Sequence, residues 1–284
     1  MPLLLEDYAL IGNGRTAALV GRDGSIDWWC VPRFDAPACF AALLGDADNG
    51  RWRIAPAGVE RARRRRYVEQ TLILETEFDA DDGSVRVTEF MPMDGPRNDI
   101  VRIVEGLRGR VAMEMELVIR FDYGRDVPWV RQCDGATLAT AGPDSVALRT
   151  PVQTRGERMR TVARFEVGAG ERVPFVLNHR ASHETEPRPL SAEHALHKTR
   201  RDWRAWSRHS RYEGRWPAQV MRSLITLKAL IHKPTGGIVA APTTSLPEQH
   251  SGVRNWDYRY CWLRDATFTL NTLLLAGYDA EAVA

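Results

Sequence analysis

The sequence has 284 residues, of which 44% are hydrophobic and 27% charged, so it can form about two ordinary globular domains with substantial cores. Its 39 basic and 37 acidic residues nearly cancel to a formal charge of +2, which argues against nucleic-acid and membrane partners. The four cysteines form no C-x-x-C pair, so neither a disulfide scaffold nor a structural metal site is expected, and nothing indicates a cofactor.

The first fifty residues predict a β-hairpin, with strands at 16–20 and 26–31 around the turn 22–25. The proline-bracketed loop 32–37 follows, and we expect it to stabilise the sheet, although it could also reach a binding site. Residues 38–44 are predicted as a short helical turn. The chain lacks a secretory signal and any run of about 18 apolar residues, so a cytoplasmic location is the default.

Residues 50–180 are predicted to be β-structure throughout. The segments 72–78 and 85–91 form a hairpin pattern, and 100–107 is a strand that we expect to end at Arg108-Gly109. Residues 111–121 then alternate apolar and polar side chains strictly, which indicates one buried and one wet face. Further strands are predicted at 136–141, 145–150, 161–167 and 172–179. Many short strands at this spacing are typical of an antiparallel β-sandwich.

The Pro- and Glu-rich segment 184–189 indicates a domain boundary, after which the pattern becomes helical. Helices are predicted at 191–208, 216–232 and 266–276, with an extended stretch at 238–247. The chain stops as another helix begins at 279–283. Because the apolar faces of these helices lack a cover, we expect the chain to be the N-terminal part of a longer protein, and to associate or express poorly by itself.

The stretch 255–265, NWDYRYCWLRD, combines two Trp, two Tyr, two Arg and two Asp. Aromatic rings can cover the C–H faces of a sugar, while Asp accepts hydrogen bonds from its hydroxyls and Arg donates to them. The alternative is an aromatic-rich structural turn in which Arg and Asp pair with each other. Composition alone favours neither interpretation.

Two sets of motifs resemble bacterial proteins of glycoside hydrolase family 15, which includes glucoamylase-like enzymes and trehalases. The first set is LEDYALIGNGRTAALV at 5–20, GSIDW at 24–28 and PRFD at 32–35, which resembles a trehalase-like N-terminal domain. The second is PTGGIVAAPTTSLP at 234–247 and NWDYRYCWLRDA at 255–266, which resembles the opening of the family's catalytic domain.

The resemblance implies a multidomain β + α fold: an antiparallel β-sandwich at 1–186, a linker helix at 187–214, and the first helices of a truncated (α/α)6 barrel at 215–284. It also implies a substrate-binding role for Tyr258, Trp262, Arg264 and Asp265, which match positions around the terminal glucose. The family cleaves terminal α-glucosidic bonds of trehalose or α-1,4- and α-1,6-glucan oligosaccharides with inversion, using two glutamates. Those catalytic residues are expected beyond Ala284, so the chain alone should be inactive.

Three functions therefore stay open. The leading one is a part of an inverting α-glucoside hydrolase whose partner is a disaccharide or oligosaccharide. Assembly as a monomer and as a homo-oligomer are both left open. A second is a non-catalytic carbohydrate-binding or regulatory β-sandwich protein. A third is a sugar phosphorylase, since related phosphorylases also join a β-sandwich to an (α/α)6 barrel.

Overall fold

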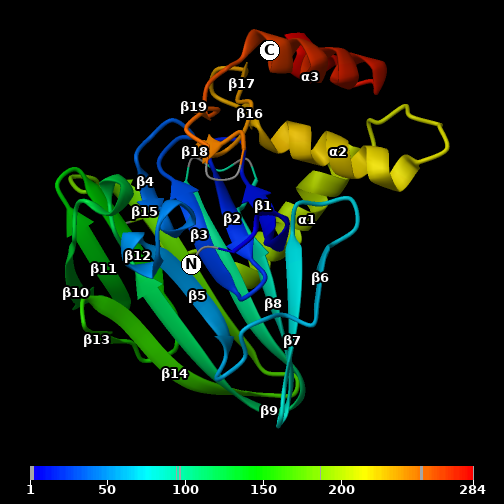
Figure 1. Cartoon of the computed structure of the whole chain (residues 1–284). Coiled ribbons are helices and arrows are strands. Elements are labelled where there is room, and N and C mark those ends of the chain that lie inside the picture. The colour runs from blue at the N-terminus through cyan, green and yellow to red at the C-terminus, as the bar shows by residue number, and fades with distance from the viewer. Residues whose placement is uncertain (1–2, 94, 96, 186, 250–251, 284) are drawn as a thin grey trace.

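The computed structural model describes residues 3–93, 95, 97–185, 187–249 and 252–283. It is mostly antiparallel β-structure with few helices (Figure 1). Strands β1 to β15 are connected through hydrogen bonds into one 15-stranded sheet, which folds over so that two layers face each other.

Both layers combine strands at the predicted positions with short strands that the sequence pattern did not single out. One layer contains β1 Tyr8–Gly12, β2 Ala17–Gly21, β3 Ser25–Cys30, β4 Ala38–Phe40, β5 Arg51–Pro56, β13 Arg155–Glu157 and β14 Arg160–Gly168. The other contains β6 Arg64–Tyr67, β7 Leu74–Ala80, β8 Gly83–Phe90, β10 Trp129–Cys133, β11 Ala136–Ala141, β12 Asp144–Arg149 and β15 Arg172–Ala181.

Strand β9 (Asn98–Val118) belongs to both layers. Its first half lies between β8 and β15, and its second half lies between β5 and β14. The predicted strand end at Arg108-Gly109 is therefore wrong. Gly109 has φ +68°, and a Cβ there would collide with the carbonyl of Asp82, so glycine lets the chain cross between layers without losing its neighbours.

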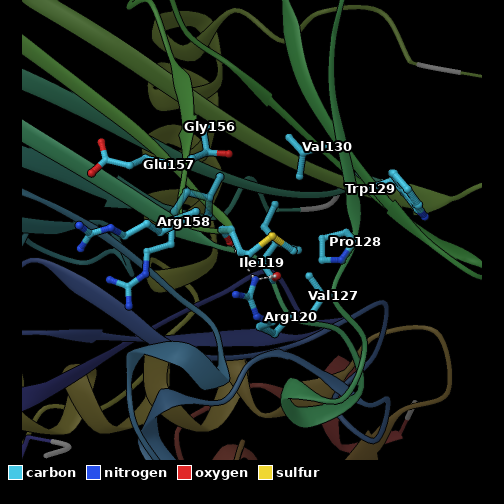
Figure 2. A pocket seen from close by; sticks show the side chains of 13 residues that line it. Ile119, Arg120, Val127, Pro128, Trp129, Val130, Gly156, Glu157 and Arg158 are labelled. Carbon is cyan, nitrogen blue, oxygen red and sulfur yellow. Dashed lines mark hydrogen bonds between the residues drawn. The ribbon is translucent and has the colours of Figure 1, made fainter.

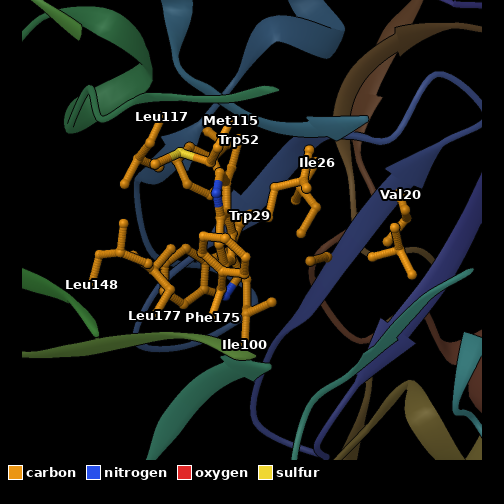
Figure 3. Close-up of a cluster of buried hydrophobic side chains, with 14 of the residues drawn as sticks. Val20, Ile26, Trp29, Trp52, Ile100, Met115, Leu117, Leu148, Phe175 and Leu177 are labelled. Atoms are coloured by element: carbon orange, nitrogen blue, oxygen red, sulfur yellow. The ribbon is translucent and has the colours of Figure 1, made fainter. Parts of the chain in front are cut away.

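The core lies between the two layers (Figure 3). Trp29 and Trp52 contribute to it from one layer, and Leu148, Phe175 and Leu177 contribute from the other, all almost completely buried. Such side chains stabilise the fold by about 1.5–3 kcal/mol each relative to exposure. They explain why the alternating pattern of the strands was a reliable guide to the architecture.

A fully buried ion pair lies in this core, between two neighbouring strands of one layer. Arg102 of β9 lies 2.6 Å from the carboxylate of Glu89 on β8, and both side chains are completely buried. The guanidinium also donates to the carbonyls of Trp52 and Gly24 in the opposite layer, at 2.9 and 2.7 Å. These bonds compensate for the burial of the charges and connect the two layers.

The helices and the remaining short strands lie at one end of the sheet (Figure 1). They are α1 Ala192–Ser207, α2 Pro217–Ala229, β16 Ile231–His232, β17 Gly237–Ile238, β18 Thr244–Pro247, β19 Asn255–Asp257, α3 Leu263–Leu275 and α4 Asp279–Val283. Ser191 caps α1, as the predicted helix start implies. The first part of α1 packs on β8, β9 and β15, while Trp203 and Trp206 near its end join a second core with α2 and α3.

Helix α3 exposes several large apolar side chains. Leu263, Phe268 and Leu275 are 85%, 69% and 78% exposed, whereas Ala266 and Leu273 pack into the second core. One face of α3 is thus packed in the second core, and another face presents an apolar surface to solvent. This agrees with the prediction that the helices have uncovered apolar faces.

One further prediction is wrong. Residues 38–44 do not form a single helical turn: β4 pairs with β3, with Ala38 opposite Cys30 and Phe40 opposite Trp29. Only Ala42–Leu44 forms a 3₁₀ turn. The free edge of β3 offers hydrogen-bond partners that the local sequence does not reveal, and pairing there outweighs the helical preference of alanine.

Candidate sugar-binding site

The stretch 255–265 links a small hairpin to a helix. Residues 255–257 form β19 and pair with β18, and α3 begins at Leu263 with Trp262 as its N-cap. The helix therefore begins three residues before the predicted position 266. This correction places Arg264 and Asp265 on the first helical turn instead of in the preceding loop.

The two aromatic residues predicted to line the site lie against each other. The rings of Tyr258 and Trp262 have centroids 5.4 Å apart and are tilted by 31°. The indole N–H of Trp262 donates to the carbonyl of Asp257 at 3.2 Å, which fixes its orientation. Both residues are partly exposed, so the pair offers a preformed aromatic surface at the start of α3.

Arg264 and Asp265 contact each other at the same helix end. Their guanidinium and carboxylate groups are 3.1 Å apart, with 66% and 33% of the side chains exposed. Asp265 also interacts favourably with the positive end of the helix dipole. An exposed pair of this kind contributes about 0–1 kcal/mol to stability, so both groups can exchange partners with a ligand at small cost. All four predicted residues are thus together at one helix start.

Arg259 holds the stretch in place, and sequence reasoning gave it no role. Its buried guanidinium makes two bonds to the carboxylate of Asp257, at 2.9 and 2.7 Å, and donates to the carbonyl of Ala36 at 2.8 Å. Burial opposes ionisation of Asp257, but the hydrogen bonds from Arg259 outweigh it and lower the pKa of that carboxyl. The spacing Asp257-x-Arg259 is compatible with their ion pair, but it cannot reveal that Arg259 also donates to the carbonyl of Ala36.

Loop 32–37 contacts this part of the chain, so the expectation that it serves the sheet alone is wrong. Phe34 is buried between Ala17 of β2 and Val239, and its ring meets that of His232 at 6.4 Å, edge to face. Together with Tyr260, these segments line a cavity of about 260 Å³. Burial and the nearby Arg33 charge lower the pKa of His232, which keeps this ring neutral near pH 7.

The two glutamates nearest to the stretch in sequence have structural partners. Glu248 accepts a hydrogen bond from the indole of Trp256 at 2.8 Å. Glu281 accepts from the indole of Trp206 and lies 3.1 Å from the ammonium of Lys228. Although burial opposes it, these contacts lower the pKa of Glu281, so it is ionised and unsuited to donate a proton.

Within the described ranges, no three or more His, Cys, Asp or Glu side chains gather in a way that could hold a metal ion. Across those same residues, no helix is long and apolar enough to span a membrane.

Comparisons with known proteins agree with this arrangement of sheet and helices. Residues 2–203 match the model of the family described as trehalase-like, N-terminal. The chain belongs to this trehalase-like family. Residues 217–284 of the trehalase-like chain match the model of glycosyl hydrolases family 15, in the order that the two motif sets imply. The resemblance inferred from the motifs is therefore confirmed.

Several relatives of the trehalase-like chain are named trehalases. One from Mycolicibacterium smegmatis is 36% identical over 310 aligned residues, which cover 98% of this chain and 46% of the relative. Another, from Thermoplasma volcanium, is 31% identical over 287 residues, covering 98% of this chain and 46% of the relative. The chain spans about half the length of these relatives.

A solved bacterial glucoamylase in complex with acarbose has a similar fold. The TM-score is 0.70 at 13% sequence identity, and the similarity covers 100% of this chain and 49% of the glucoamylase chain. A putative kojibiose phosphorylase from the human microbiome is less similar, with a TM-score of 0.51 at 9% identity over 96% of this chain and 45% of that one. At these identities the likeness shows the fold alone.

Proposed function

We propose that the chain is the N-terminal part of an inverting glycoside hydrolase that acts on terminal α-glucosidic bonds of trehalose or α-glucan oligosaccharides. The observation that carries the proposal is the placement of Tyr258, Trp262, Arg264 and Asp265 at the start of α3, on a stretch held by Arg259. The trehalase names of the relatives and the matches to both family models support it.

The proposed domain organisation follows the two main cores. Residues 1–186 form the β-sandwich, 187–214 form the linker that contains α1, and 215–284 begin an (α/α)6 catalytic domain. The buried members of the first core all lie between residues 9 and 177, whereas the second core combines Leu72 with the end of α1, α2 and α3. The exposed apolar side of α3 is consistent with further helices packing there in the whole enzyme.

In this function the four site residues position the sugar. The aromatic pair covers a C–H face of the terminal glucose, Asp265 accepts hydrogen bonds from its hydroxyls, and Arg264 donates to them. Their exposed mutual ion pair is exchanged for bonds to the substrate. Binding energy gained there orients the scissile bond toward the two catalytic carboxyl groups, which inverting enzymes hold about 6.5–9.5 Å apart. We propose that both lie beyond Ala284, and that the chain alone has no hydrolase activity.

The test is the anomeric form of the first product. Hydrolysis of trehalose with inversion releases one glucose as the β-anomer and leaves the other as the α-anomer, so proton NMR should show both at equal initial amounts. The protein to be tested is the product of the complete reading frame that contains these 284 codons. Initial release of α-glucose alone would contradict inversion, and formation of glucose phosphate only with added phosphate would identify a phosphorylase.

Replacement of the site residues tests the subsite. Asp265→Ala and Arg264→Ala should each lower kcat/KM by about 10- to 150-fold, because each removes a charged hydrogen bond of about 1.5–3 kcal/mol to the reacting sugar. Arg201→Ala, on the exposed face of α1, is a matched control that should leave kcat/KM unchanged. Near-normal kcat/KM for both site variants on trehalose and on maltooligosaccharides would refute the assignment.

A further inference from the structure

A cavity of about 430 Å³ lies between the edges of the two layers (Figure 2). Residues 127–130, at the start of β10, form one wall, and the β13–β14 turn at 156–161 forms the other. Among the described residues, β10 pairs with β11 alone and β13 pairs with β14 alone, so each strand has an open edge. The cavity size is within the range of about 300–1,000 Å³ that is usual for small-molecule sites.

Arg120 supplies a buried positive charge to this cavity. The residue is only 8% exposed, and its Nη1 donates to the carbonyls of Ile119 at 2.8 Å and Met159 at 3.2 Å. Within the described part of the chain, no carboxylate lies within ion-pair distance of it, and its Nε and Nη2 have no hydrogen-bond partner. Neither nitrogen is fully buried, so both remain available to a ligand.

The neighbouring charges do not neutralise Arg120. Asp48 attracts it, but that carboxylate is already 2.7 Å from the guanidinium of Arg160, which also binds Glu116 at 2.6 Å. Arg158 and Glu157 both line the same cavity and are exposed, and the carboxylate of Glu157 is paired with the guanidinium of Arg155 at 3.2 Å. A buried guanidinium without an acidic partner is costly, which explains why burial lowers the pKa of Arg120.

The rest of the lining is mainly apolar and partly open. Val127, Val130 and Met159 line the cavity while 45%, 50% and 69% exposed, and Pro128 lies between them (Figure 2). Met159 and Arg158 occupy the turn with φ of +61° and +47°, a left-handed conformation that costs side chains other than glycine about 1–3 kcal/mol. This turn directs the Met159 carbonyl to Arg120 and maintains the wall.

We propose that this cavity binds a small organic anion, in which a carboxylate or phosphate group is joined to an apolar body. The oxyanion binds the free Nε and Nη2 donors of Arg120, with Arg158 adding positive potential at the rim. The apolar body packs against Val127, Val130 and Met159. This site is independent of the proposed sugar site at the start of α3, so either can fail without the other.

Ligand-observed NMR titration of the chain tests the proposal with hexanoate and phenyl phosphate as probes. The uncharged compounds hexanol and phenol have the same apolar bodies, so comparing dissociation constants isolates the contribution of the anionic group. We expect at least one anion to bind about ten-fold or more tightly than its neutral match, since charged hydrogen bonds supply the difference. The preferred probe tells whether the natural ligand carries a carboxylate or a phosphate.

Three variants locate the site. Arg120→Met should weaken binding of the preferred anion about ten-fold or more. Val130→Asp lowers the net charge by one inside the cavity at a half-exposed position, so it keeps the test valid if Arg120→Met fails to fold. Arg131→Gln lowers the charge by the same amount on the adjacent position, outside the cavity lining, and should leave the dissociation constant within about two-fold.

Equal binding of each anion and its neutral match would overturn the proposal, as would unchanged binding by Val130→Asp. Equal weakening by Arg131→Gln and Val130→Asp would show attraction to the general surface charge and would overturn it as well.

Discussion

Replacing Arg259 by Met should loosen the sugar-binding stretch while leaving the sheet intact. The substitution removes two bonds to Asp257 and one to the carbonyl of Ala36 from a side chain that is 6% exposed. Breaking a buried ion pair costs about 3–5 kcal/mol. Because 30% of the Asp257 side chain is exposed, water compensates in part, and we expect a local cost of about 2–4 kcal/mol.

Hydrogen exchange followed by mass spectrometry measures this cost by segment, which a single unfolding curve cannot do for a chain with two cores. Amides in 255–265 should lose protection by about 30- to 700-fold, the equivalent of that free energy. Amides of β9 should keep theirs. Arg264→Met is the matched control from the same stretch: its exposed pair predicts a change of about 1 kcal/mol or less.

Exchange in 255–265 that stays within about three-fold of the parent chain in Arg259→Met would refute this anchoring role of Arg259. An equal loss of protection in Arg264→Met would also refute this role, because the buried and the exposed ion pair would then contribute the same free energy. In a double-mutant cycle, Asp257→Asn combined with Arg259→Met should cost less than the two single changes added together.

Three other predictions concern the rest of the chain. Burial raises the pKa of the Asp27 carboxyl above its usual value of about 4, so the folded state binds this proton more tightly than the unfolded state does. The free energy of unfolding should therefore fall as the pH rises from about 4 through the raised pKa. Asp27→Asn should flatten this part of a Tm-against-pH profile, and an unchanged slope would contradict the assignment. Glu89→Gln leaves the fully buried Arg102 without its partner and should cost about 3–5 kcal/mol in urea unfolding, whereas a loss below about 1 kcal/mol would show that the pair is dispensable. Leu275→Glu, on the same exposed apolar face of α3 as Phe268, should reduce association of the chain in sedimentation experiments. Undiminished association would place the contact elsewhere.

Periodicity located most elements because burial on one face imposes it directly. The strict alternation of 111–121 corresponds to the second half of β9, and the predicted strand 136–141 coincides with β11. The wrong predictions occur where pairing with residues distant in sequence determines the local structure. Whether Gly109 ends a strand depends on the neighbours at both edges of β9, and those come from segments up to residue 181.

Prediction of the site was likewise successful for residues close in sequence and unsuccessful for contacts between distant segments. The motif placed Tyr258, Trp262, Arg264 and Asp265 together because they are close in sequence, and the structure brings them to one helix start. It could not show that Arg259 bonds to Ala36, since more than two hundred residues separate the two in the chain. Nor could it show the cavity around Arg120, whose walls come from segments that are separate in sequence.

The shared strand β9 has a consequence for synthesis on the ribosome. Each half of β9 has one partner that precedes it in the chain, β5 or β8, and one that follows it, β14 or β15. While the chain emerges, both halves can pair on one edge only, and the other edge stays open until residues 160–181 appear. Open edges of apolar strands are templates for aggregation. A pause in translation after β9 would therefore prolong the exposure of these open edges.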